Sequence, residues 1–355
     1  MFSIKKLQPY IKQFWERADI TMLIICVICS IFGTVMIYRA SSSMVAAGWE
    51  MNTNKQIIVQ VFSMFLGIGA YVLLTVIDAD LLAGQWKFLI GIQPSEIIKI
   101  IYIIVAATQM TWLKEYRDIN SFPSVAMMAG HFVLVFGAIV VVSSDLGSAS
   151  IILCIFLTMF FALGVRLYWF ALGGAAISAM VPLLWEYFLK PYQKNRLLAP
   201  YDASIDPKND GINWQTYQSK ITLASGRTTG VDAEHRYTAF TGKHTDFIFS
   251  CIGEELGMIG CIIVLILLTI LIIRCVRIGL KAGRTFDMLL CIGVASAMTF
   301  QMFINIGMCL GITPVIGITL PFFSYGGSSM VTMFAALGLV SGVKYKLKPK
   351  LFSIY

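Results

Sequence analysis

The stretch Lys243–Gly257 holds the side chains with the clearest potential for chemistry. It reads Lys-His-Thr-Asp-Phe-Ile-Phe-Ser-Cys-Ile-Gly-Glu-Glu-Leu-Gly, so Asp246 stands where a long polar segment meets a strongly apolar one. A carboxyl group at that position lies at a boundary between membrane and water, where ionisable groups are costly and usually functional. Partial burial raises a carboxyl pKa towards neutral pH, which suits a general base.

A second pair of charges lies inside apolar sequence. Glu96 and Lys99 are three residues apart, on one face of a helix predicted to follow Gln93. An exposed ion pair at a helix end is the plainer interpretation. Two charges one turn apart at a membrane boundary nevertheless favour a function.

Several other polar residues have a structural interpretation beside the functional one. Asp145, flanked by small residues, fits a tight turn with a polar cap as well as a functional role. Asp246 itself fits a helix N-cap. Gln301 and Asn305, four residues apart, are typical of a stripe that holds membrane helices together. His131 fits a packing residue better than a ligand.

The composition indicates a polytopic membrane protein. The chain of 355 residues is 58% hydrophobic and 13% charged. The net charge of +8 does not indicate nucleic acid binding, because the basic residues cluster at the ends of apolar segments, where topology and anionic lipid explain them. The eight cysteines all fall in apolar segments, so neither disulfides nor a cysteine metal site is expected.

Nine apolar segments are long enough to cross a membrane, so we predict a single all-α membrane domain over residues 1–355. Residues 190–246 form one long polar loop, and loops of that length are usually functional or disordered. Within it, Gln215–Leu223 is predicted to be an interfacial amphipathic helix that ends at Gly226. The predicted spans are Ala18–Tyr38, Ile57–Ile77, Gln93–Trp112, Ser124–Ser143, Ala149–Val165, Tyr168–Phe188, Phe247–Ile273, Met288–Cys309 and Met330–Val343.

The distribution of lysine and arginine conflicts with nine crossings. Both termini are basic and are expected in the cytoplasm, whereas nine crossings would place them on opposite sides. Counting from each terminus places one missing crossing between Ile77 and Gln93, where the stretch Leu81–Ile92 is too short to cross as an ordinary helix.

Several motifs, in order along nearly the whole chain, resemble the SEDS family, which includes RodA, FtsW and SpoVE. The resemblance implies a ten-span glycosyltransferase that polymerises lipid II into peptidoglycan outside the cytoplasmic membrane, with a class B penicillin-binding protein as its transpeptidase partner. Tyr192–Arg196 and Lys220 are slightly closer to the RodA branch. The matching stretches are Gln93–Lys99, Ser144–Ser148, Tyr192–Arg196, Gln218–Ser219, His244–Gly257 and Asn305–Ser329.

The resemblance also assigns roles to residues. The family's essential aspartate corresponds to Asp246, the expected general base, and Glu96 and Lys99 are expected to line the same cavity. Cationic side chains, alone or with a divalent cation such as Mg²⁺ or Mn²⁺, would neutralise the pyrophosphate leaving group, and the displacement would invert the anomeric centre. Further residues expected to bind substrate are Asp145, Arg196, Ser219, Lys220, His244 and Ser324.

The sequence departs from the family pattern at four places, which keeps two other functions open. The family's third span and its Arg-Trp motif are missing near Leu81–Ile92, and Arg227–Gly230 replaces a Gly-Lys-Gly motif. Phe240–Gly242 replaces Leu-Pro-Glu, and Ser144 replaces a proline. A lipid II flippase would also need charges within the membrane, and a degenerate scaffold would only recruit the transpeptidase. The concentration of polar residues in one external loop favours the enzyme.

Overall fold

The structure, a computed structural model, describes residues 14–15, 18–76, 94–143, 145–187, 189–232 and 240–346. All regular secondary structure in these ranges is helical, and nine of the helices described are long and apolar enough to cross a membrane. The predicted all-α polytopic fold is therefore confirmed. The nine are α2 (Ile20–Ala46), α3 (Thr53–Val76), α5 (Pro94–Tyr116), α6 (Phe122–Ala138), α7 (Leu146–Leu163), α8 (Leu167–Tyr187), α11 (Ile248–Lys281), α12 (Thr285–Leu310) and α13 (Gly327–Lys346).

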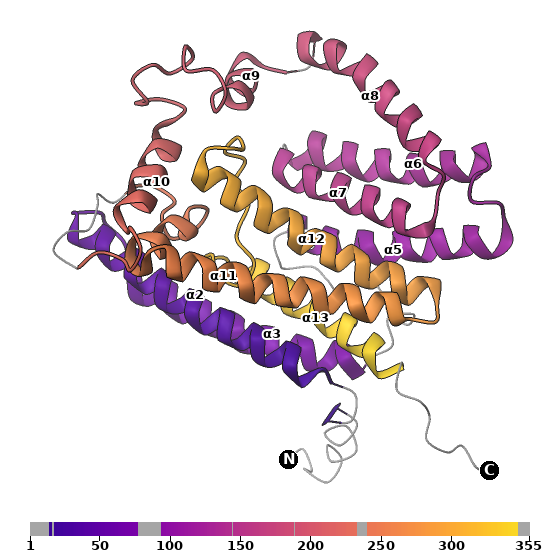
Figure 1. Cartoon of the computed structure of the whole chain (residues 1–355), viewed down its shortest axis with the longest axis horizontal. Coiled ribbons are helices and arrows are strands. Elements are labelled where there is room, and N and C mark those ends of the chain that lie inside the picture. The colour runs from indigo at the N-terminus through magenta and orange to yellow at the C-terminus, as the bar shows by residue number, and fades with distance from the viewer. Residues whose placement is uncertain are drawn as a thin grey trace.

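The helices form one bundle with a single loosely attached member (Figure 1). α13 packs along α3, and α12 packs along α11, α7 and α5. Small residues allow the closest contacts, since Gly67 faces the Phe334 ring and Gly338 faces the backbone of Tyr71. α8 arches away from the bundle in Figure 1, and no side chain whose burial is described along this helix is buried.

A charged cluster ties several helices together at one end of the bundle. The buried Asp19, at the start of α2, pairs with Arg274 of α11 at 2.5 Å and with Lys344 of α13 at 3.2 Å. The last turn of α3 also lies near this cluster. Its residue Thr75 donates a hydrogen bond through Oγ1 to the carbonyl of Gly338 on α13 at 3.3 Å. We call this end, where basic side chains gather, the basic end.

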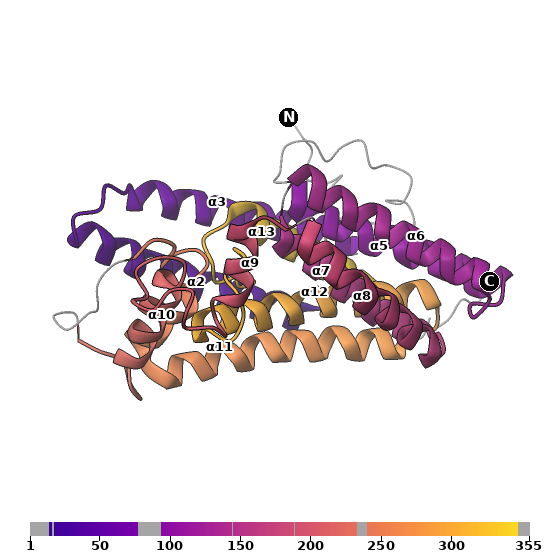
Figure 2. The ribbon, with the colours of Figure 1, turned by 90° about the horizontal axis from the view of Figure 1, so that it is seen from above.

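The opposite end, called the outer end below, carries the short helices α9 (Pro191–Leu198) and α10 (Trp214–Ser225), which lie towards the left of both Figure 1 and Figure 2. α5 begins at this end, because Glu96 lines a cavity with Gly317 and Tyr325 of the α12–α13 loop. α3 thus ends at the basic end and α5 begins at the outer end. The crossing predicted to be missing between Ile77 and Gln93 falls on residues outside the described ranges and stays a prediction. Leu81–Ile92, Ser144 and the basic terminal segments themselves lie outside the described residues.

α11 is longer than a membrane requires, and a break divides it. Its 34 residues would extend about 51 Å, against a hydrocarbon core of about 30 Å. Gly257, with φ 63° and ψ −161°, interrupts the helix, and the next N–H groups bond to loop carbonyls, Met258 to Arg227 at 2.9 Å and Ile259 to Thr228 at 3.3 Å. A side chain at Gly257 would overlap the Thr228 backbone. The turns before Gly257 therefore stand at the outer end.

The predicted helix at Gln215–Leu223 is confirmed as α10, with Gly226 at its C-cap. Its place in the membrane interface stays a prediction. Its buried face is polar and packs against α11 and α12, whereas Trp214 and Tyr217 are exposed. Polar side chains that bond within the protein explain this orientation, because they leave the apolar rings free to face outwards. The buried residues are Thr216, Gln218, Ser219 and Thr222.

Candidate active site

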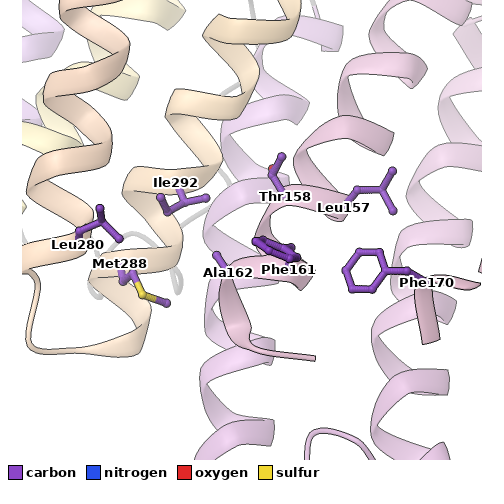
Figure 3. A pocket seen from close by; sticks show the side chains of 8 residues that line it. All are labelled: Leu157, Thr158, Phe161, Ala162, Phe170, Leu280, Met288 and Ile292. Carbon is purple, nitrogen blue, oxygen red and sulfur yellow. The ribbon is translucent and has the colours of Figure 1, made fainter. Parts of the chain in front are cut away.

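The groove in Figure 3 lies among α7, α8 and the α11–α12 hairpin, near the basic end, and has a volume of about 500 Å³. Its lining is apolar apart from Thr158, whose hydroxyl donates to the Cys154 carbonyl at 2.9 Å. A groove of this kind faces lipid hydrocarbon and offers no group for proton transfer. The polar cavities at the outer end are therefore the better candidates for a reacting site.

Asp246 lies in the turn directly before α11. The N-cap of that helix is Phe247, so the interpretation of Asp246 as a helix cap is wrong. The turn is fixed through the backbone, because Asn305 Nδ2 of α12 donates to the Asp246 carbonyl at 2.8 Å and to the Ile318 carbonyl at 2.7 Å. The prediction that Asn305 holds elements together is thus confirmed, and its side chain joins Asp246 to the α12–α13 loop.

The Asp246 carboxyl is half-buried and faces the α12–α13 loop. Its Oδ2 lies 3.8 Å from the position that a Cβ on Gly317 would occupy, an ordinary contact distance, so the loop lies directly against the carboxyl. Burial raises the pKa of Asp246, and the positive charge of Arg196 on α9 partly opposes this rise. A carboxylate with a raised pKa is a stronger base than an exposed one and can accept a proton near neutral pH.

Glu96 and Lys99 form a buried ion pair. Lys99 Nζ lies 2.8 Å from Glu96 Oε1, and the two residues are 2% and 8% exposed, so the exposed-pair interpretation is wrong. Both line a cavity of about 120 Å³ between α5, α7, α12 and the α12–α13 loop. Glu96 Oε2 is buried without a hydrogen-bond partner among the described residues. Asp246 is not among the residues that line this cavity, so the prediction that the pair shares a cavity with Asp246 stays a prediction.

A second cavity, of about 100 Å³, adjoins the first. It is lined by Asp145, Arg196 and Ile316 among others, and Asp145 lines both cavities. The predicted polar cap is confirmed, since Asp145 Oδ1 accepts the N–H of Ser148 at 2.9 Å at the start of α7. The loop segment 316–319 contributes to both cavities and approaches Asp246 at Gly317. Asp145, Arg196, Glu96, Lys99 and Asp246 thus surround one loop.

His244 lies two residues before Asp246 and packs against the same loop. Its ring centroid is 5.8 Å from that of Tyr325, and its carbonyl accepts the Tyr325 N–H at 3.1 Å. Burial lowers the pKa of His244, so its ring is neutral at physiological pH. His244 fixes the loop against the turn that carries Asp246.

Four of the predicted substrate-binding residues, His244 and three more, are not among the residues that line these two cavities. Ser219 is fully buried, with its Oγ 2.5 Å from Ser250 Oγ and 2.9 Å from the Cys309 carbonyl. Ser324 Oγ accepts the Leu320 N–H at 2.7 Å and closes a turn of the α12–α13 loop. Lys220 is exposed on α10, with its ammonium end against Gly311. Their roles in substrate binding stay predictions.

Lys243 has a structural role that the sequence analysis did not assign. Its Nζ lies 2.5 Å from Glu254 Oε2, and both side chains are inaccessible to solvent. The pair links the turn before α11 to the second turn of that helix. A spacing of eleven residues across a helix start matches no helical periodicity, so no sequence pattern indicated it.

The donor groups around Asp246 do not fit a resident metal ion. Within the described ranges, no three His, Cys, Asp or Glu side chains lie close enough together to hold one. Glu96 pairs through Oε1 with Lys99, and Asp145 caps the N-terminus of α7. We derive no step through a divalent cation.

Comparison with known proteins agrees with this architecture. The family model for FtsW, RodA and SpoVE, described as cell cycle protein, matches residues 83–349. Peptidoglycan glycosyltransferase MrdB of Escherichia coli (strain K12) is 32% identical, over 94% of this chain and 96% of that protein. A probable peptidoglycan glycosyltransferase FtsW of Geobacter sp. (strain M18) is 27% identical, over 94% and 98%.

Solved structures show the same fold. A chain from a study of the structural coordination of polymerization and crosslinking by a peptidoglycan synthase complex has a TM-score of 0.75 and 26% identity, over 94% of this chain and 99% of that one. RodA of Thermus thermophilus has a TM-score of 0.64 and 23% identity, over 92% and 96%, a likeness of fold alone. The chain therefore belongs to the FtsW/RodA/SpoVE family of cell cycle proteins.

Proposed function

We propose that this protein is a peptidoglycan glycosyltransferase that polymerises lipid II at the outer face of the cytoplasmic membrane. Its family and the named activity of MrdB, at 32% identity, support this function. The observation that carries the proposal is the half-buried Asp246 carboxyl, which lies beside Arg196. This carboxyl faces the α12–α13 loop, and the same loop borders the Glu96–Lys99 cavity. A proton acceptor, a cation and a polar cavity are the parts that such a reaction needs.

In the proposed reaction, Asp246 acts as general base. It accepts the proton of the acceptor sugar's hydroxyl as that oxygen attacks the anomeric carbon of the donor. The bond between this carbon and the pyrophosphate oxygen breaks at the same time, so the configuration inverts and the pyrophosphate leaves as an anion. Arg196, which is exposed at the outer end beside Asp246, supplies the positive charge that stabilises the leaving group.

Other residues hold this base in place. Asn305 anchors the Asp246 carbonyl, and the Lys243–Glu254 pair anchors the preceding turn. The buried Glu96–Lys99 pair lies across the α12–α13 loop and, in this proposal, contacts the sugars rather than the reacting hydroxyl. Lys220 remains a further cation at the same end for the pyrophosphate.

The test is polymerisation of lipid II by purified protein in detergent. Asp246→Asn should reduce the rate at least about 100-fold, the usual contribution of a general base. Its melting temperature should stay equal or rise, because burial penalises the ionised carboxyl. Asp202→Asn, on an exposed loop acid, is the matched control and should keep full activity. Polymer of normal length from Asp246→Asn would overturn the assignment, and no polymer from the wild type would favour the flippase or the scaffold.

The proposal extends to a partner. The solved structure with a TM-score of 0.75 comes from a complex that coordinates polymerization and crosslinking. We therefore expect a class B penicillin-binding protein transpeptidase to associate with this chain. Copurification of the two proteins, and rescue of a polymerase-depleted strain by the wild type but not by Asp246→Asn, would separate an active polymerase from a scaffold.

A further inference from the structure

Gln301 is a buried amide without a partner. It lies in the middle of α12, is 1% exposed and lines the cavity that contains Glu96 and Lys99. Its Oε1 accepts no hydrogen bond among the described residues, and Glu96 Oε2 beside the same cavity is equally unpaired. An unpaired buried polar group costs about 1–3 kcal/mol. Two such groups facing one cavity indicate that something polar occupies it.

Asn305, one turn away on the same helix, also has an unpaired side-chain oxygen, but it does not line this cavity and its amide nitrogen is fully used. Its amide nitrogen bonds to two backbone carbonyls and holds the Asp246 turn. Gln301 therefore does not serve as the helix-linking residue that its spacing from Asn305 suggested. Its acceptor oxygen remains available for a ligand.

The charges of the cavity select the kind of ligand. Glu96 and Lys99 neutralise each other, and the unpaired Glu96 oxygen repels anions, so a phosphate is disfavoured. The free acceptors of Glu96 and Gln301 require a donor, and the Lys99 ammonium has further N–H groups to donate. A neutral group with one N–H and one C=O, an amide, meets both requirements.

The volume limits the size of that group. A cavity of about 120 Å³ holds a small polar group together with a few water molecules. An acetamido substituent, with four heavy atoms, is small enough to enter it. Ile151 of α7 also lines the cavity and is 1% exposed, so it supplies an apolar surface for a methyl group.

We propose that this cavity is the subsite for the acetamido group of an aminosugar in the lipid-linked substrate, with Gln301 as its positioning residue. The amide N–H donates to Gln301 Oε1 or Glu96 Oε2, and the amide C=O accepts from Lys99. This rests on the proposed function, because the substrate class comes from it. The subsite would make the enzyme selective for N-acetylated sugars.

The first test separates a ligand from trapped water. Gln301→Met keeps the volume but removes the amide. We expect KM for lipid II to rise about tenfold, kcat to stay within about twofold, and the melting temperature without substrate to stay equal or rise, because an unpaired buried group is removed. Unchanged KM with a lower melting temperature would mean that Gln301 only binds ordered water, and would overturn the proposal.

The matched control is Gln60→Met. Gln60 is also fully buried, but its Nε2 donates to the Ser324 carbonyl at 3.3 Å and its Oε1 accepts from the Gly326 N–H at 3.4 Å. Losing these bonds should lower the melting temperature. The melting temperature is thus expected to stay equal or rise in Gln301→Met and to fall in Gln60→Met. This difference would exclude a general effect of replacing a buried glutamine by methionine.

The second test adds one methylene to the substrate's acyl group and removes one from the cavity wall. Lipid II carrying N-propionyl in place of N-acetyl groups should bind the wild type about tenfold more weakly, because in the proposed pose the added carbon presses on the Ile151 wall that the acetyl methyl group contacts. Ile151→Val removes one methylene from the cavity wall and should restore much of that affinity. Equal binding of both substrates by the wild type would overturn the proposal.

Both tests are read by equilibrium binding to the inactive Asp246→Asn protein as well as by turnover. If the wild type forms no polymer, the proposed function fails while the binding comparison still decides the subsite. If polymer forms but neither Gln301→Met nor N-propionyl substitution weakens binding, the subsite fails and the proposed function stands.

Discussion

Asp246 combines two opposing influences on one carboxyl. Burial disfavours its ionised form and raises its pKa, while the charge of Arg196 favours that form and lowers it. A general base must be ionised before it can accept a proton. Activity should therefore rise with pH through the pKa of Asp246 and be lost below it, which places the acid limb of the pH profile under the control of Arg196.

Arg196→Gln should move that limb. Without the guanidinium the pKa of Asp246 rises further, so kcat/KM should begin to fall at a higher pH than in the wild type. The rate at the optimum should also fall, since the leaving group loses its cation. The measurement is the pH profile of polymerisation, with Lys194→Gln on the same helix as control. An acid limb that stays in place would show that Arg196 does not act on the base.

The sequence singled out the candidate site residues better than the residues that support them. Asp246, Glu96 and Lys99 stood out because each is charged within or beside apolar sequence, where ionisable groups are costly and usually functional. Lys243 was indistinguishable from a surface lysine, because its partner Glu254 lies eleven residues on, across a helix start. Gln301 looked equivalent to Asn305 by spacing, but in the structure the Asn305 amide nitrogen donates to two backbone carbonyls, whereas Gln301 lines the cavity.

The outer turns of α11 form a small unit anchored to the rest of the protein by charge and backbone contacts. The Lys243–Glu254 pair holds the turn that precedes the helix, and the loop at Arg227 and Thr228 caps the break at Gly257. Because the pair is shielded from water, removing one partner leaves the other charge buried without compensation, which destabilises the fold. The position of Asp246 then depends on an ion pair that never touches substrate.

Lys243→Met should therefore destabilise the protein by about 3–5 kcal/mol. Polymerisation should fall as well, because the Asp246 turn loses its anchor. The free energy of unfolding, followed by titration with a denaturing detergent, gives the measurement. Lys55→Met, on an exposed lysine at the same end, should change it by less than about 0.5 kcal/mol. The double variant Lys243→Met with Glu254→Met should recover part of the lost stability, and no recovery would argue against the pair.

At the scale of the molecule, hydropathy located every described span but not its bounds. The first span was predicted as Ala18–Tyr38, whereas α2 extends to Ala46 through Arg39 and three serines. α11 likewise continues past the predicted Ile273 to Lys281. Hydropathy detects the hydrocarbon layer, but a helix ends where its capping contacts and packing end it. The pairing of α3 with α13, far apart in sequence, follows from packing that no periodicity encodes.

The proposed chemistry requires the Asp246 end to face outwards, and the charged residues predict that it does. The basic end joins Asp19, Arg274 and Lys344, and the loops at Arg166 and Lys281 project from the same side. Lysine and arginine favour the cytoplasmic side. The reacting turn lies at the opposite end, with α9 and α10.

Labelling single introduced cysteines in intact cells tests this orientation. The eight native cysteines are buried or half-buried, so the background should be low. A membrane-impermeant maleimide should label Lys55→Cys and Asp202→Cys directly, but Arg166→Cys and Lys281→Cys only after permeabilisation. The reverse pattern would place Asp246 in the cytoplasm, where it could not act on lipid II presented at the outer face. The fold would stand in that case, but the proposed reaction would have to be abandoned, because the base and its substrate would lie on opposite sides of the membrane.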